Sequence, residues 1–123
     1  MKYYNFQNEE VSQDCYKHML HCFVGRCQDV VDDSMRNYSF EKKLFVNKGR
    51  RYDKIISEDV GTNSNQTSVW AFVDKTNGDI LKAESWRKPA KHARGNIYES
   101  DSMQFIGPYG PAYMDTIKSY YGA

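Results

Sequence analysis

The sequence predicts an α+β fold in which an N-terminal helix packs on a small antiparallel sheet of three or four strands. Three observations predict this. Apolar residues recur at helical spacing near the N-terminus, strand-like runs separated by turn residues fill the middle, and proline and glycine interrupt the last third. The length of 123 residues suits a single domain over residues 1–123, with a core that needs no disulfide or metal.

The N-terminal helix is expected to begin near Glu9, after a short aromatic tail or edge strand over residues 1–8. Its apolar stripe has spacings of three and four residues. The glycine at position 25 either ends this helix or lies within a longer one that runs to about Asn37. The stripe consists of Val11, Cys15, Met19, Cys22 and Phe23.

Strand-like pieces follow in the middle of the chain. Residues 44–47 and 51–57 are rich in β-forming residues, and residues 59–68 have the composition of a loop. Residues 69–83 form the best-defined hairpin, with Gly78 available for a turn of positive φ. Both faces of the first hairpin strand are largely apolar, which predicts a central strand covered on one side by the helix.

The last third of the chain is expected to be mostly irregular. Pro89 and Gly95 enclose a stretch that has room for a turn or two of helix, and Pro89 suits a first helical position, where amide groups face an anion. Residues 105–114 read as a loop that packs by its aromatic side chains. Residues 114–121 are expected to form a short final helix.

A run of cations around one tryptophan is the main candidate for a binding site. The net charge of the chain is only +1, so attraction to an anionic ligand has to be local. Phosphate binding needs clustered cations, and a neighbouring tryptophan offers a face on which a base stacks. The expected site consists of Lys82, Trp86, Arg87, Lys88, Lys91, His92 and Arg94.

The same run is equally typical of a solvated edge that follows a hairpin, with Trp86 as a core anchor. Under the binding hypothesis, the cationic surface is larger than this run alone if cations of neighbouring strands lie beside it. Those cations are Arg50, Arg51, Lys54 and Lys75.

The three cysteines, Cys15, Cys22 and Cys27, are an odd number, and the N-terminus has no apolar run typical of a signal peptide. A reducing, intracellular compartment is therefore expected. Cys15, His18 and Cys22 share one helical face, but positions seven residues apart lie about 10 Å apart, so core packing is favoured over a metal site. No metal or other cofactor is expected. The sequence contains no run of about 18 apolar residues, so no membrane partner is expected either.

Catalytic residues are not singled out by their arrangement. Asp74 and Asp79 flank the hairpin turn, where carboxylates ordinarily accept hydrogen bonds from turn amides rather than act as an acid–base pair. Serine, cysteine and histidine show no spacing typical of a nucleophilic site. The sequence therefore favours a binding protein over an enzyme.

Several short motifs recur in order in the middle half of the chain, over residues 49–98. This stretch resembles a family of small uncharacterised proteins of tailed bacteriophages and phage-derived genomic segments, with the pattern YDKI, FVD..TGD and K.ASWK.PAK..R.N. The chain departs from it with Glu84 in place of a small residue and Arg87 in place of lysine. The matches are Tyr52, Asp53, Lys54, Ile55, Phe72, Val73, Asp74, Gly78, Asp79, Lys82, Ser85, Trp86, Pro89, Ala90, Lys91 and Arg94.

This resemblance implies a phage-encoded protein that acts in the cytoplasm of the host bacterium or in the virion, and it implies no particular activity. One hypothesis is an accessory protein that binds a phosphate-bearing ligand, such as single-stranded nucleic acid or a nucleotide. The alternative is a protein-interaction module without catalytic activity, either an inhibitor of a host defence protein or a minor virion component. A third hypothesis is an enzyme acting on nucleotides.

The tyrosines near the C-terminus allow two interpretations. Tyrosine favours protein interfaces, but these side chains are expected instead to cover the far side of the core. They are Tyr109, Tyr113, Tyr120 and Tyr121.

Overall fold

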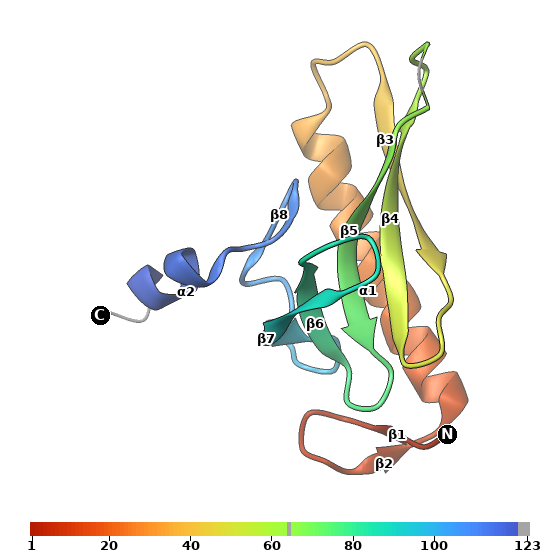
Figure 1. The fold of residues 1–123 in the computed structure, drawn as a ribbon, viewed down its shortest axis with the longest axis vertical. Coiled ribbons are helices and arrows are strands. Elements are labelled where there is room, and N and C mark those ends of the chain that lie inside the picture. Colours follow the sequence, from red (N-terminus) through yellow and green to blue (C-terminus); the bar gives the residue numbers. More distant parts are fainter. Residues whose placement is uncertain (64, 121–123) are drawn as a thin grey trace.

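The computed structural model describes residues 1–63 and 65–120, and its largest element is a five-stranded antiparallel sheet (Figure 1). The strand order β3-β4-β5-β6-β7 follows the chain, so each strand pairs with the next after a reversal. The strands are β3 (Glu41–Asn47), β4 (Tyr52–Val60), β5 (Thr67–Asp74), β6 (Asp79–Ala83) and β7 (Pro89–Asn96).

Two short hairpins complete the strands. β1 (Tyr3–Tyr4) pairs with β2 (Glu10–Val11), and β8 (Ile106–Gly107) pairs with β9 (Gly110–Pro111). The predicted fold class, α+β with a helix on a sheet of three or four strands, is therefore wrong. The described residues are mostly sheet, with one five-stranded and two two-stranded sheets, one long helix and one short helix.

The long helix, α1 (Gln13–Ser34), begins later than expected and continues through Gly25. Ser12 caps it, because its hydroxyl accepts a hydrogen bond from the Cys15 amide at 3.0 Å. Of the five residues of the predicted stripe, only Phe23 is fully buried. Tyr16 and Leu20 face the sheet where the prediction had placed Cys15, Met19 and Cys22. The buried residues are Tyr16, Leu20, Phe23, Cys27 and Val31.

The main core lies between α1 and one face of the sheet. The stripe of α1 packs against buried residues of β4, β5 and β6, and Ile97 closes the cluster. The central position of β5 in the sheet agrees with its apolar sequence on both faces. The sheet residues in this core are Ile55, Trp70, Ala71, Val73 and Ile80.

The opposite face of the sheet buries a smaller apolar layer. Ile56, Phe72 and Leu81 are almost fully buried there, although no helix covers them. The connection between β6 and β7, residues 84–88, passes over β4 and β5 instead (Figure 1). This connection therefore brings part of the predicted basic run onto the sheet.

β7 is the longest strand that the sequence did not predict; the two-residue strands β2, β8 and β9 were not predicted either, since residues 10–11 were expected to be helical and residues 105–114 a loop. Residues 89–96, expected to hold at most a short helix, pair with β6 through Ile80 opposite Gly95 and Leu81 opposite Ala93. Proline is tolerated because it begins an edge strand, and the φ of Gly95 is +154°. Because the stretch is a strand, no helix N-terminus at Pro89 faces an anion.

Other expected elements are confirmed. β3 contains the predicted strand 44–47, and β4 begins one residue after the start of the predicted strand 51–57. The hairpin of residues 69–83 is β5 and β6, although β4 and β5 extend into both ends of the expected loop 59–68, and the final helix is α2 (Met114–Tyr120). Residue 64 of the expected loop and residue 121 of the expected final helix lie outside the described residues. None of the described helices is long and apolar enough to cross a bilayer.

The C-terminal tyrosines do not cover the core as expected. Tyr109 is 84% exposed, Tyr113 68% and Tyr120 65%, whereas Tyr121 lies outside the described residues. The indole Nε1 of Trp70 donates to the Pro108 carbonyl at 3.2 Å and holds the β8–β9 hairpin to the sheet. This contact with the Pro108 carbonyl fixes the segment, while the side chains of Tyr109, Tyr113 and Tyr120 remain largely exposed.

Candidate functional site

The tip of the β6–β7 hairpin presents Trp86 beside a cation of β4. Trp86 is 46% exposed, so it is not the core anchor of the alternative interpretation. The Lys54 Nζ lies 5.2 Å from the centroid of the Trp86 ring and 5.9 Å from that of Phe72. A cation and a partly exposed aromatic ring are thus held together by residues 32 positions apart.

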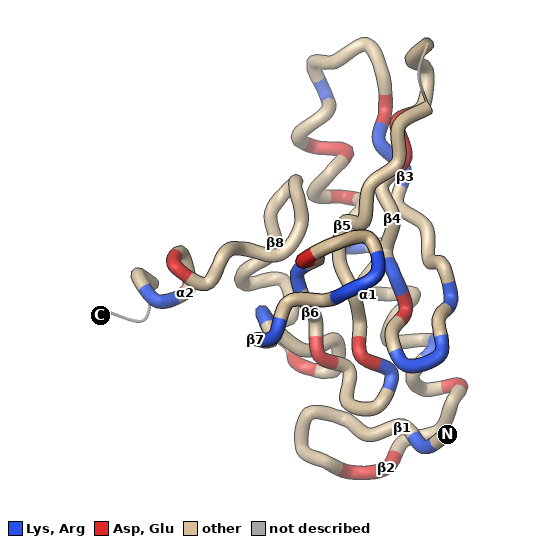
Figure 2. The backbone as a smooth tube through the Cα atoms, viewed as in Figure 1, with Lys and Arg blue, Asp and Glu red and all other residues tan. Residues whose placement is uncertain are grey.

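Four more of the predicted site residues have exposed side chains. They belong to the connection and to the first half of β7, and Figure 2 shows Lys and Arg positions of this connection in front of β4 and β5. Lys88 pairs with Glu84 at 3.4 Å, and both side chains are largely exposed. The four are Arg87, Lys88, Lys91 and His92.

Arg51 extends the cationic surface along the same face of the sheet. Its guanidinium carbon lies 5.2 Å from the centroid of the Tyr52 ring, and its Nη2 lies 3.2 Å from Asp74 Oδ2. The hydrogen bond that Arg51 donates to the Asp74 carboxylate raises the pKa of its guanidinium above the ordinary value. We call this surface the basic sheet face. It consists of Arg51, Tyr52, Lys54, Trp86, Arg87, Lys88 and Lys91.

Lys82 and Arg94 do not join the basic sheet face, because both side chains bind main-chain carbonyls. The Lys82 Nζ donates to the Pro111 carbonyl at 3.0 Å and lies 4.1 Å from the centroid of the Tyr113 ring. The Arg94 side chain, almost fully buried, donates to the carbonyls of Ala112, at 3.1 Å, and His92. Burial lowers the pKa of both groups, and for Lys82 the charge of Arg94 lowers it further. These two cations hold the end of β9 and the residue that follows it in place.

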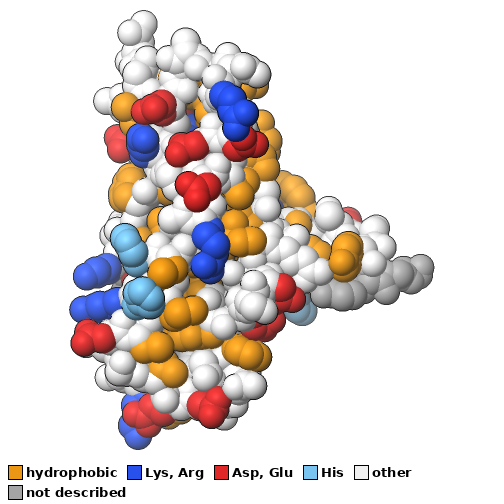
Figure 3. Space-filling view, turned by 180° about the vertical axis from the view of Figure 1, so that it is seen from behind, with side chains coloured by type: hydrophobic (Ala, Val, Ile, Leu, Met, Phe, Trp, Pro, Cys, Tyr) orange, Lys and Arg blue, Asp and Glu red, His pale blue; other side chains and the backbone are white. Residues whose placement is uncertain are grey.

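A groove between α1 and β3 is a second site, and the sequence analysis did not find it. It encloses about 610 Å³. Figure 3 views the molecule from behind, where hydrophobic side chains gather over the lower half beside histidine and Lys or Arg side chains. The lining includes Leu20, Val24, Leu44 and Val46 along its walls and Lys17, Lys48, Asp53 and Lys75 at one end.

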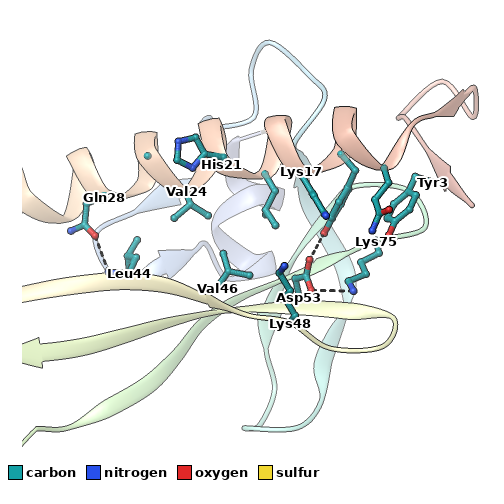
Figure 4. Close-up of a pocket in the computed structure, with 14 residues that line it drawn as sticks. Tyr3, Lys17, His21, Val24, Gln28, Leu44, Val46, Lys48, Asp53 and Lys75 are labelled. Carbon is teal, nitrogen blue, oxygen red and sulfur yellow. Dashed lines mark hydrogen bonds and ion pairs between the residues drawn. The ribbon is translucent and has the colours of Figure 1, made fainter. Parts of the chain in front are cut away.

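Asp53 organises the polar end of this groove (Figure 4). Its carboxylate accepts hydrogen bonds from the Tyr16 hydroxyl at 2.9 Å and the Gly49 amide at 3.2 Å, and it lies 3.4 Å from the Lys75 Nζ. Asp53 is 3% exposed, so these donors replace the water that it loses. Burial, followed by the charge of Asp53, raises the pKa of the Tyr16 hydroxyl far above its ordinary value.

The turn before β4 positions this cluster. Lys75 Nζ donates to the Gly49 carbonyl at 2.6 Å while the Gly49 amide binds Asp53. A Cβ at position 49 would lie 2.2 Å from the Tyr52 carbonyl oxygen, so only glycine fits the turn. The sequence could not reveal the cluster, because its members come from α1, two turns and β4.

At the other end of the groove, a side chain of α1 pairs with the edge of β3. Gln28 Nε2 donates to the Lys42 carbonyl at 2.8 Å, and its Oε1 accepts from the Leu44 amide at 2.8 Å. The amide of Gln28 thus satisfies two main-chain groups that face away from β4. The groove lies between this contact and the Asp53 cluster.

The cysteine–histidine stretch of α1 forms no metal site in the described part of the chain, where no group of three or more His, Cys, Asp or Glu side chains is placed to hold an ion. His18 Nε2 lies 3.7 Å from Cys22 Sγ on the helix surface. Cys27 is fully buried, and burial raises the pKa of its thiol to about 12.

Comparison with known proteins gives a family but no activity. A model of a family of unknown function (DUF7717) matches residues 2–108, which covers the five-stranded sheet, the groove and the basic sheet face. No curated protein and no solved structure matches the chain.

Proposed function

The chain belongs to that family of unknown function, and we propose that it binds a phosphate-bearing ligand, single-stranded nucleic acid first among them, on the basic sheet face. The observation that carries this proposal is the Lys54–Trp86 contact, which sets a cation against one side of a ring that is 46% exposed. A base of the ligand can stack on the Trp86 indole while the adjacent Lys54 neutralises a phosphate of the same strand.

Charges on this face support the proposal. Among the described residues, Lys54, Arg87 and Lys91 form no ion pair, so they bind a phosphate without losing a carboxylate partner. Lys88 is paired with Glu84 only at the surface, where such a pair contributes about 0–1 kcal/mol and a phosphate replaces the carboxylate at little cost.

We also propose the setting. The resemblance to tailed-phage proteins supports an accessory protein acting in the host bacterial cytoplasm, with the virion as the alternative. In either place, a surface that contacts phosphate and base planes binds single strands with little sequence preference, because every base offers a flat face.

The test is a fluorescence anisotropy titration of a labelled ten-nucleotide oligothymidylate at several salt concentrations. Three contacted phosphates give a slope of log K against log salt of about −2 for a single strand. Joint Arg87→Ala and Lys91→Ala substitution is expected to lower the affinity about tenfold and reduce the slope to about −1. Trp86→Ala is expected to weaken binding about tenfold with an unchanged slope, because stacking releases no counterions.

The control removes the same charge elsewhere. Arg36 at the end of α1 and Lys118 on α2 are exposed and lie outside the basic sheet face, so Arg36→Ala with Lys118→Ala is expected to leave the affinity within about twofold. Equal loss in both double variants would mean that net charge alone attracts the strand. Absence of binding at low salt to the oligonucleotide and to free nucleotides would remove the proposal.

A protein partner is the second candidate, and the exposed C-terminal tyrosines favour it. Tyr109 and Tyr113 project from the segment that Lys82 and Arg94 hold, and exposed tyrosine is typical of protein interfaces. Purification from infected cells after nuclease treatment, with Tyr109→Ser and Tyr113→Ser as the matched variant, separates the candidates. A stoichiometric complex that survives nuclease and disappears with this variant supports the protein partner.

A further inference from the structure

The groove between α1 and β3 has the size of a small-molecule site. Pockets that hold such ligands enclose roughly 300–1,000 Å³, and this one encloses about 610 Å³. One wall is the side of α1 that carries Leu20 and Val24, and the other is the edge strand with Leu44 and Val46. Both walls are apolar in the middle, so a bound molecule is expected to present an apolar body to them.

A glycine in the helical wall keeps this space open. Gly25 lines the groove from the middle of α1, and a Cβ built there would meet no atom within 4 Å. Glycine inside a helix is unfavourable by about 1 kcal/mol relative to alanine, and no close backbone approach requires it here. The local effect of glycine at position 25 is therefore that the groove is wider than it would be with any larger residue there.

The charge at one end of the groove determines which polar group of a ligand it can bind. Figure 4 shows Lys17, Lys48 and Lys75 pointing toward the end occupied by Asp53. Asp53 and Lys75 neutralise each other at 3.4 Å. Among the described residues, Lys17 and Lys48 have no ion-pair partner, so two positive charges remain at this end. Lysine is a point charge without a demand for planar geometry, so carboxylate, sulfonate and phosphate head groups all satisfy it.

We propose that this groove binds a small amphipathic anion, with its acidic head group between Lys17 and Lys48 and its apolar body between α1 and β3. This site is separate from the basic sheet face, which lies on the other side of the sheet.

Two dyes that differ by one charge test the proposal directly. 8-Anilinonaphthalene-1-sulfonate carries a sulfonate on an apolar body, and N-phenyl-1-naphthylamine has the same rings without the charge. We expect saturable binding of the sulfonate dye at one site per chain, with weaker binding of the neutral dye. Lys17→Gln with Lys48→Gln is expected to lower the affinity for the sulfonate dye about tenfold and leave that for the neutral dye unchanged.

Gly25→Leu fills the groove from the wall. Because position 25 faces open space and leucine favours a helix, the melting temperature of this variant is expected to equal or exceed that of the parent protein. Both dyes are expected to lose at least about tenfold in affinity. An unchanged melting temperature also excludes dye binding to a partly unfolded state, which exposes apolar surface.

The remaining outcomes decide against the groove or its charge preference. Arg36→Gln with Lys118→Gln removes two cations elsewhere, so an equal loss in this control would mean that net charge attracts the dye. Unchanged binding in Gly25→Leu would place the dye outside the groove. Equal affinity for both dyes in the parent protein, or no saturable binding of either, would overturn the proposal.

Discussion

The Asp53 carboxylate connects three segments, because it binds the Tyr16 hydroxyl of α1, the Gly49 amide and the Lys75 Nζ. Tyr16→Phe keeps the ring that packs 5.0 Å from the ring of Tyr3 and removes only the hydroxyl. A buried carboxylate left short of a donor costs about 1–3 kcal/mol, so we expect that loss in the free energy of unfolding measured with urea.

The matched control for this measurement is Tyr38→Phe, which removes a hydroxyl from a residue that is 60% exposed. It is expected to change the free energy of unfolding by less than about 0.5 kcal/mol. Equal effects of the two substitutions would show that another donor replaces Tyr16 at Asp53.

The three thiols are expected to differ in reactivity. Burial raises the Cys27 pKa to about 12, so at pH 8 this group is a protonated, inaccessible thiol, whereas Cys15 and Cys22 are only partly buried. A disulfide reagent is expected to modify two thiols in the native protein and the third only in denaturant. Cys27→Ser should leave the native count at two, and a native count of three in the parent protein would contradict the burial of Cys27.

The same thiol makes stability depend on pH in the alkaline range. The unfolded thiol ionises near its ordinary pKa of 9.0 and the folded one near 12, so the folded state holds more protons within that window. The contribution of Cys27 is therefore complete below pH 9 and is lost as the pH rises toward 12. Urea unfolding at pH 8 and pH 10.5 is expected to show lower stability at the higher pH.

At the scale of elements, Gln28 protects the edge of β3. Gln28→Ala breaks its hydrogen bonds to Lys42 and Leu44, so we expect faster hydrogen exchange of the Leu44 amide and a loss of about 1–3 kcal/mol in the free energy of unfolding. Gln13→Ala, at the exposed start of α1, is the control. Unaltered exchange at Leu44 would show that water or another group satisfies the edge.

Edge protection also has a consequence for solubility. A strand edge with unpaired main-chain groups pairs with other chains, so Gln28→Ala is expected to self-associate at concentrations where Gln13→Ala stays monodisperse. Light scattering measures this difference.

The elements that depend on local signals were predictable from the sequence. The hairpin of β5 and β6 has a glycine with a φ of +82° at position 78, which is the residue that the turn requires. β7 was missed because Pro89 and Gly95 are ordinarily breakers. In an edge strand, Pro89 needs no outward partner and Gly95 gives room to Ile80, and pairing with β6 outweighs their low β propensity.

The candidate sites were predictable only in part, for a similar reason. Consecutive cations around Trp86 mark one surface, but the sequence cannot show that Lys54 reaches that ring or that Arg94 is buried. The groove has no local signal, because its lysines come from α1, the turn after β3 and the turn after β5.

At the scale of the whole molecule, one sheet separates two candidate ligand sites. Asp53 and Lys54 are neighbours in β4, yet Asp53 faces α1 and Lys54 lies against Trp86 on the other side. β4 is paired on both edges, so binding at one face is expected to have little effect at the other. A saturating oligonucleotide should change the dissociation constant of the sulfonate dye by less than about twofold.

A change of about fivefold or more in that titration would instead show that β4 transmits a shift between the two faces. The variant Gly25→Leu, which fills the groove, provides the reciprocal measurement. If the faces are independent, its affinity for the oligonucleotide equals that of the parent protein.

The contacts of Lys82 and Arg94 predict an unusual pattern of mutational tolerance. Every amino acid supplies a main-chain carbonyl, so position 112 can change freely while the two cations that bind this segment cannot. A library scored only for ligand binding would group Lys82 and Arg94 with Arg87, since all three losses weaken the binding signal. Scoring cellular abundance in parallel separates them: the first two variants are expected to disappear from the folded pool, and Arg87 variants to remain in it.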